Sequence, residues 1–514
     1  MRQSHLILFN ATIMWVSRLL LLVPQLILVP YLLGTIGESG YGVYVLVWSL
    51  IASVEQLQLS LQQGVIKYSA GFLAQGRMDE VNKVVSSSFL YSILLAIVSC
   101  AGMLVAAAFY NDASGQIGSG LVVVGVMLLF IVPLTPYIAV IQSRQRYYVG
   151  AIAETISKYV SLLAAVAWFG MVGPSVEALI IIMAGMLFLS RLAQVPIAHR
   201  LVPGLQNRPS LFNGVHFRLI ATFGAVIVLI SLCLAANSTG IRWLMASLAS
   251  TRFVAHLAIM LMPGILLTQI ISAISITVMP ATSAYEATGN RQMLQELLIR
   301  GMRYTMILAL AGLLTAALLM RNVLSVWLGS DYIFLTPFAL VFFASEAFIM
   351  STGVAHHMLK GLGKLWAVVF IYSLGLVIVP IGLILIVFKT WHNPYIAVTS
   401  GLAAGHLVCG CLNIGFCAKA VHTGLREVFV RVYAQPLLVA AVVSLVAFGI
   451  VTTGGINGLI GRTCVSALSV VLFFGGCYFL IATAAERQYV KELAQAISKK
   501  VTALRSLGPA SNKS

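Results

Sequence analysis

Fourteen long apolar runs constrain the fold of this chain more than any other feature of its sequence. A helix needs about 20 apolar residues to cross the hydrocarbon of a bilayer. The expected spans are approximately 10–33, 41–64, 85–109, 119–141, 154–172, 176–197, 217–238, 253–279, 304–328, 335–358, 365–388, 395–418, 430–452 and 463–485. Residues 240–252 could instead form an interfacial helix, which would lie along the membrane surface. The sequence therefore predicts an all-α polytopic membrane protein.

The distribution of positive charge predicts the orientation of these helices. The chain has 31 Lys and Arg against 14 Asp and Glu. If the N-terminus is cytoplasmic, 25 of the 31 cations fall on the inner side, five on the outer side, and Arg18 inside the first span. Inner loops of membrane proteins carry such an excess of Lys and Arg. We therefore expect both termini to be cytoplasmic, and the charge indicates topology rather than nucleic-acid binding.

Two similar segments indicate an internal duplication. Ser69–Val81 reads SAGFLAQGRMDEV and Ser283–Leu294 reads SAYEATGNRQML, and each lies between two apolar runs. They follow the second and the eighth expected span, so the repeated unit has six helices, and an even number keeps both units parallel. The expected parts are an N-lobe (1–216), a C-lobe (217–429), two further helices (430–486) and a basic cytoplasmic tail (487–514).

Several short motifs resemble those of polysaccharide-transporter flippases. The motifs are Asn10 before the first span, Leu33-Gly34, Gly40-Tyr-Gly-Val-Tyr44, the Gly64–Gly76 loop, Pro280-Ala-Thr-Ser-Ala-Tyr285 and Gly289-Asn-Arg291. These flippases belong to the superfamily of multidrug, oligosaccharidyl-lipid and polysaccharide exporters. The resemblance covers about residues 10–485 and implies two lobes around a central cavity.

The resemblance also implies a function. Such proteins move polyprenyl-pyrophosphate-linked oligosaccharides from the cytoplasmic to the outer leaflet of the bacterial inner membrane, for O-antigen or exopolysaccharide synthesis. The expected partners are the lipid-linked oligosaccharide, membrane lipids and polysaccharide polymerase machinery. The alternative is a cation-coupled multidrug or small-molecule exporter of the same superfamily.

An anionic cargo needs a cation inside the membrane, and Arg18 in the first span is the first candidate. Gln25 continues its helical face, while Glu55, Gln58 and Gln62 form a polar stripe on the second span. We expect this set to contact substrate. Glu55 could neutralise Arg18 in a static ion pair. Alternatively, a substrate phosphate could bind Arg18 and displace Glu55, whose free carboxylate would then bind a proton. Arg18 could instead extend to the inner interface.

Further polar residues lie in later spans. Glu346 in the tenth span is a candidate coupling-ion site, and a protonated Glu bonded to a neighbouring helix is the alternative. His256 is a candidate substrate contact, as are His406 and Asn413, although an interhelical hydrogen bond would explain each of them.

The sequence lacks several motifs that are typical of enzymes. It has no phosphate-binding GxxxxGK[ST] loop, zinc-ligand spacing or nucleophile elbow. The seven cysteines fall inside expected spans and lack metal-ligand spacing. We therefore expect no enzymatic activity, no metal and no cofactor.

Overall fold

The computed structural model describes residues 2–109, 115–276, 278–456, 458–484, 486–488 and 492. Every regular element in these ranges is helical. Within the described ranges, fourteen helices are long and apolar enough to cross a membrane. The expected fold class, an all-α polytopic membrane protein, is thereby confirmed. Most of the expected tail 487–514 lies outside the described residues.

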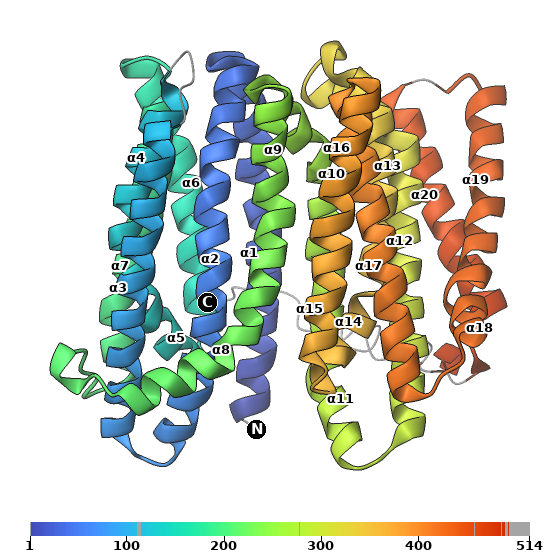
Figure 1. Ribbon diagram of the computed structural model, residues 1–514. Coiled ribbons are helices and arrows are strands. Elements are labelled where there is room, and N and C mark those ends of the chain that lie inside the picture. The colour runs from blue at the N-terminus through green and yellow to red at the C-terminus, as the bar shows by residue number, and fades with distance from the viewer. Residues whose placement is uncertain are drawn as a thin grey trace, which may run out of the picture.

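The first seven helices form one bundle, drawn from blue to teal in Figure 1. They are α1 (Arg2–Thr35), α2 (Gly37–Ala74), α3 (Met78–Phe109), α4 (Gln116–Ile131), α5 (Thr135–Ser143), α6 (Tyr147–Met171) and α7 (Val176–Leu201). A short 3-10 turn joins α4 to α5 within one span, Gln116–Ser143. Pro133 lies in this 3-10 turn and Pro136 in the first turn of α5, and both favour the break because proline lacks a backbone donor.

The second bundle follows on the other side of the molecule (Figure 1). Its helices are α10 (Thr251–Ile276), α11 (Val278–Ala287), α12 (Arg291–Trp327), α13 (Thr336–Ser351), α14 (Gly353–Gly361), α15 (Leu365–Tyr372), α16 (Val379–Trp391) and α17 (Pro394–Val421). At its edge lie α18 (Leu425–Val428), α19 (Gln435–Thr453) and α20 (Leu459–Gly476). Helices α19 and α20 pack against each other and against α12.

Helix α8 (Gly214–Ala235) links the two bundles. It packs against α2 and α3 of the first bundle and α15 of the second. A π-helical turn, Ala236–Gly240, continues it into α9 (Ile241–Leu248). Together these elements form the seventh span, Gly224–Leu248. The alternative of an interfacial helix over 240–252 is therefore wrong. The seventh span ends at Leu248, about ten residues beyond the expected end at 238.

The two similar sequence segments fold into the same turn. Gly76 and Gly289 have φ of +70° and +67°, a region that favours glycine. In both turns the glycine N–H donates to the carbonyl three residues back, and the next N–H donates to the carbonyl five residues back. The following N–H donates to the glycine carbonyl in each case. This shared pattern supports the duplication as a structural repeat.

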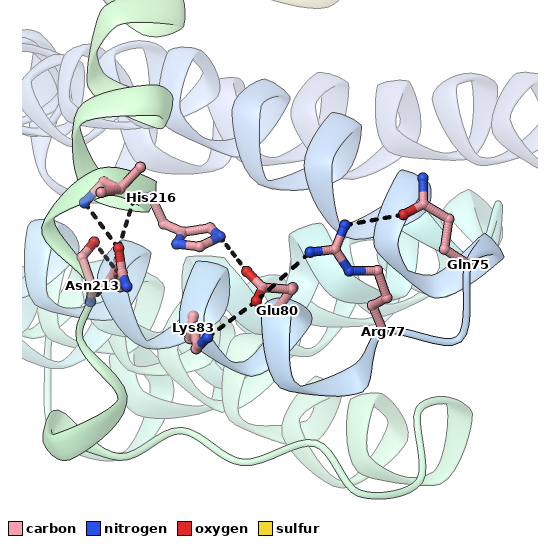
Figure 2. A network of polar contacts seen from close by, with 8 residues as sticks. Gln75, Arg77, Glu80, Lys83, Asn213 and His216 are labelled. Carbon is pink, nitrogen blue, oxygen red and sulfur yellow. Dashed lines mark hydrogen bonds and ion pairs between the residues drawn. The ribbon is translucent and has the colours of Figure 1, made fainter.

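The first of these turns also anchors the start of α8, at the lower end of Figure 1. Figure 2 shows the Glu80 carboxylate between Lys83 Nζ at 3.1 Å and His216 Nε2 at 2.7 Å. Asn213 caps α8 by accepting hydrogen bonds from the backbone N–H of Val215 and His216. These contacts fix the segment that connects the bundles to the first bundle.

The bundles meet at the upper end, where α1 ends and α2 begins (Figure 1). A Cβ atom added at Gly42 of α2 would lie 1.8 Å from the Thr251 carbonyl oxygen of α10. Only glycine permits this approach. Ser39 and Thr251 share a 2.8 Å hydrogen bond, and Arg252 forms an ion pair with Glu38. The largest apolar cluster, which includes Leu46 and Leu257, also spans both bundles.

Candidate functional site

Two adjoining cavities open along the inner face of the first bundle. The upper cavity has a volume of about 410 Å³ and the lower one about 520 Å³. They share six lining residues, namely Arg18, Leu21, Trp48, Glu154, Lys158 and Met183. Tyr41 lines only the upper cavity and Gln62 only the lower one. From Tyr41 to Gln62, α2 rises about 32 Å, which matches the hydrocarbon thickness of a bilayer.

The cavity walls carry more positive than negative charge. Their cations are Arg18 on α1, Lys158 on α6, Arg191 on α7 and Arg242 on α9, and their carboxylates are Glu55 on α2 and Glu154 on α6. Four cations against two carboxylates give a formal lining charge of +2. Charges inside a membrane are unfavourable unless they are neutralised, so this excess favours an anionic occupant.

Glu55 pairs with Arg191 and not with Arg18. The Arg191 Nη2 atom lies 2.5 Å from a Glu55 carboxylate oxygen, across the lower cavity from α7 to α2. Arg18 Nη1 contacts the Gln269 carbonyl oxygen of α10 at 3.5 Å. The expected Arg18–Glu55 pair is therefore wrong. Helix α7 lies opposite Glu55 across the cavity. The spacing of residues along α1 and α2 gives no information about which side chain of α7 Glu55 meets.

The three expected glutamines lie in different environments. Gln25 lines the upper cavity and is exposed there. Gln62 lines the lower cavity and its Nε2 donates to Gln142 Oε1 at 3.1 Å. Gln58 is buried and accepts a 2.5 Å hydrogen bond from Thr135 of α5. It lines neither of these two cavities, and its Nε2 is buried without a hydrogen-bond partner among the described residues, so its role as a substrate contact stays a prediction.

His256 also lies away from the cavities. It is buried in α10 at the upper end, with Nδ1 at 2.6 Å from the Tyr395 hydroxyl and Nε2 at 3.3 Å from the Glu38 carboxylate. These two partners come from α17 and α2, so His256 belongs to the contact between the bundles. A substrate contact by His256 stays a prediction.

Glu346 lies in a polar cluster of the second bundle. Thr268 of α10 donates to its carboxylate at 2.7 Å, and His406 Nδ1 of α17 lies 3.5 Å from the same carboxylate. Ser345 contacts the same His406 nitrogen at 3.1 Å. Glu346 is therefore not an isolated carboxylate. Among the described residues, no group of three or more His, Cys, Asp or Glu could hold a metal ion.

Sequence reasoning missed three of the four cavity cations. The count of cations by side includes Lys158 and Arg191 among the 25 inner ones and Arg242 among the five outer ones, yet all three lie within candidate membrane-spanning helices. One signal was available: Glu154 and Lys158 are four residues apart inside an expected span, which puts them on one helix face. Lys158 Nζ also lies 4.9 Å from the Trp48 ring centroid, a cation–π contact.

The sequence matches no protein-family model and no curated protein, whereas the fold matches solved transporters. An inward-facing multidrug resistance MATE family transporter of the MOP superfamily has a TM-score of 0.67 at 14% identity, covering 78% of this chain and 94% of that one. An outward-facing structure of a transporter of the same description gives 0.60 at 14% identity, covering 81% and 95%.

A MOP superfamily transporter from Pyrococcus furiosus, described as having a binding pocket of reverse polarity, gives a TM-score of 0.59. It is 14% identical, and the match covers 80% of this chain and 94% of that one. The chain thus has the fold of MATE transporters and is a multi-pass membrane protein.

Proposed function

We propose that this protein is a transporter that moves an anionic, lipid-linked oligosaccharide across the membrane by alternating access. The observation that carries the proposal is the formal lining charge of +2 in cavities that extend about 32 Å along α2. A pyrophosphate head group supplies the missing negative charge. Its oxygens are suited to guanidinium groups, which donate several hydrogen bonds in a planar fork.

Arg18 and Lys158 line both cavities and are the proposed head-group ligands. The polar side chains Gln25 and Gln62 lie above and below this pair, where sugar hydroxyls would need hydrogen-bond partners. Arg191 is already neutralised by Glu55. Phosphate binding near Arg191 would compete with Glu55, and the freed carboxylate would then accept a proton.

The contacts between the bundles support the alternating-access part of the proposal. Ion pairs and hydrogen bonds join the bundles at the upper end through Glu38, Arg252 and Thr251. The fold superposes better on an inward-facing than on an outward-facing transporter, with TM-scores of 0.67 and 0.60. We propose that the upper end is the outer gate in its closed state, which is consistent with the expected cytoplasmic N-terminus in a bacterial inner membrane.

Ion coupling is proposed at Glu346. Its carboxylate has a hydroxyl and an imidazole within 3.5 Å, in helices α10 and α17 of the second bundle. A carboxylate in this setting can bind a proton or a small cation, and the neutral or ion-bound form would change the contacts between these helices.

A second candidate function is export of multidrug-type small molecules. The descriptions of two structural neighbours favour it, since both are called multidrug resistance transporters. Cationic drugs would require an excess of carboxylates in the cavity, whereas the cavity walls here have an excess of cations. This charge is the reason for preferring an anionic cargo.

A deletion strain separates the two functions. Lipid extracts would be probed for a sugar-linked polyprenyl pyrophosphate that stays in the cytoplasmic leaflet, and the same strain would be tested for drug sensitivity. Accumulation that wild-type protein reverses supports the flippase. Normal surface glycolipid together with new drug sensitivity contradicts it and supports the exporter.

A further inference from the structure

Arg242 lines the upper cavity and not the lower one, together with Tyr41 and Tyr44 of α2. Three residues before it, Thr239 makes hydrogen bonds with Ser49 and Ser53 of α2. Arg242 therefore lies near the depth of Trp48, on the α9 side of the upper cavity.

The guanidinium of Arg242 is only partly satisfied by protein. Its Nη1 donates to the Ser238 carbonyl oxygen of the preceding turn at 2.9 Å. Its Nε is buried and has no hydrogen-bond partner among the described residues. A buried donor without a partner is unfavourable, and more so when it carries charge. The group therefore lacks an acceptor that a ligand could supply.

Two of the other three cavity cations differ from Arg242 in this respect. Arg191 has Glu55 as its partner at 2.5 Å, and Lys158 lies near Glu154 on its own helix. Within the described part of the chain, no carboxylate forms an ion pair with Arg242. Packing alone would not require an arginine at such a position, since an uncompensated charge in a membrane destabilises the fold.

The backbone that holds Arg242 is fixed to α2. It follows the π-helical turn Ala236–Gly240, in which Thr239 donates to the Ser49 carbonyl at 2.8 Å and accepts from Ser53 at 2.6 Å. Such π turns are frequent at functional sites of helices. Ser49 itself lines the upper cavity. The guanidinium is thus held against the cavity wall by contacts that do not use its own free donors.

We propose that Arg242 forms a second phosphoanion subsite on the α9 side of the upper cavity, in addition to the subsite of Arg18 and Lys158. It binds a phosphate or pyrophosphate group that has moved on from that first subsite. The cargo assignment rests on the proposed function, but the ligand chemistry follows from the guanidinium, its free Nε and the cavity.

The subsite also lies close in sequence to the contact between the bundles. Helix α9 ends at Leu248, and Arg252 at the start of α10 pairs with Glu38 of the first bundle. A phosphoanion at Arg242 therefore sits below the closed upper end, on the helix that leads into the contact between the bundles. Cargo held there is positioned for release when the upper end opens.

Binding of two probes to the full-length protein in lipid nanodiscs tests the proposal. The probes are inorganic pyrophosphate and farnesyl pyrophosphate, measured by isothermal titration calorimetry. The variants are Arg242→Gln, Arg242→Lys, Arg18→Gln and the double Arg18→Gln/Arg242→Gln. Arg321→Gln is the matched control, because Arg321 is an exposed arginine of α12 that lines neither cavity.

Arg242→Gln removes a charged hydrogen-bond donor and should weaken binding at its own subsite about tenfold or more. Wild type should therefore bind the probe at two sites, each single variant at one, and the double variant should lose binding. Loss of the site for the lipid probe alone assigns the subsite to a lipid head group, and its loss for both probes assigns it to phosphate in general. Unchanged affinity and unchanged stoichiometry for both probes in Arg242→Gln overturn the subsite. If Arg242→Gln does not fold, unchanged affinity in Arg242→Lys, whose ammonium lacks the planar fork, overturns it.

Two outcomes separate this subsite from the proposed function. Impaired translocation in Arg18→Gln, together with normal binding and translocation in Arg242→Gln, removes the subsite and leaves the flippase. Weakened pyrophosphate binding in Arg242→Gln, together with normal glycolipid in the deletion strain, removes the flippase and leaves the subsite.

Discussion

Arg191 of α7 and Glu55 of α2 form a 2.5 Å ion pair across the lower cavity. The two side chains are partly exposed to the cavity, at 18% and 35%. The pair joins two helices that are 136 positions apart at these residues. The pair therefore joins two walls of the lower cavity. It also neutralises two of the charged side chains that line the cavity.

The first prediction concerns the stability of this pair. Arg191→Gln or Glu55→Gln alone leaves the other charge without its partner and should lower stability by about 1 to 3 kcal/mol. The double variant should recover most of the loss, because no unpaired charge remains. Thermal unfolding in detergent measures the double-mutant cycle, and additive losses would show that the two residues act independently.

Arg18 is the subject of the second prediction. Arg18→Ala should reduce translocation at normal protein levels by about tenfold or more, since a charged hydrogen-bond donor on the wall of both cavities is lost. Arg18→Lys should be milder because it keeps the charge. The measurement is recovery of surface polysaccharide in the deletion strain, with Arg321→Ala as the control. Full activity of Arg18→Ala would remove Arg18 from the mechanism.

Glu346→Gln tests ion coupling. The neutral amide cannot gain or lose a proton, so transport should lose its dependence on pH or on the coupling cation. His406→Gln, which changes the neighbour at 3.5 Å, should shift this dependence rather than remove it. Initial transport rates in proteoliposomes with imposed ion gradients measure both variants. An ion dependence that is unchanged in Glu346→Gln would place coupling elsewhere.

The fourth prediction concerns closure of the upper end. Gly42→Ala adds a Cβ at 1.8 Å from the Thr251 carbonyl, so α2 and α10 must separate. Gly34→Ala in α1 is the matched control, because nothing lies within 4 Å of its added Cβ. Spin labels on the α1–α2 and α12–α13 turns should report a longer distance for Gly42→Ala than for wild type or the control. Equal distances in all three would contradict the close contact.

A buried ion pair outside the cavities gives a pH prediction. Glu486, beyond the last span, pairs with Arg303 of α12 and accepts hydrogen bonds from Tyr304 and Thr483. Burial alone would raise the pKa of the Glu486 carboxyl, but these hydrogen bonds and the Arg303 charge lower it below its ordinary value.

A lowered folded-state pKa means that this stabilisation is complete above the ordinary pKa of Glu and is lost as the pH falls toward the folded-state value. The melting temperature of wild type should therefore fall between pH 5 and pH 3 more steeply than that of Glu486→Gln, which should also melt lower at pH 7. Parallel melting curves over this pH range would rule out the contribution of Glu486.

The fold could be predicted from sequence because its main signals are local. The length of the apolar runs predicts the membrane spans. Gly76 and Gly289 mark the repeated turn because that turn requires a positive φ, which glycine adopts readily. The partners of the site could not be predicted in this way. Arg191 meets Glu55, and His256 meets Tyr395, only because helices far apart in sequence pack with particular rotations. The count of cations on the inner and outer sides of the membrane also places Lys158 among the loop residues, although Lys158 lines the cavity.

The central claim is that the cavity carries an anionic cargo. Its most direct test is a leaflet-reversal assay in proteoliposomes with a fluorescent, short-chain polyprenyl-pyrophosphate sugar, run beside efflux of a lipophilic cationic dye. The account predicts reversal of the anionic lipid that is slowed by Arg18→Ala and untouched by Arg321→Ala, with no transport of the dye. Transport of the dye without reversal of the lipid would contradict it.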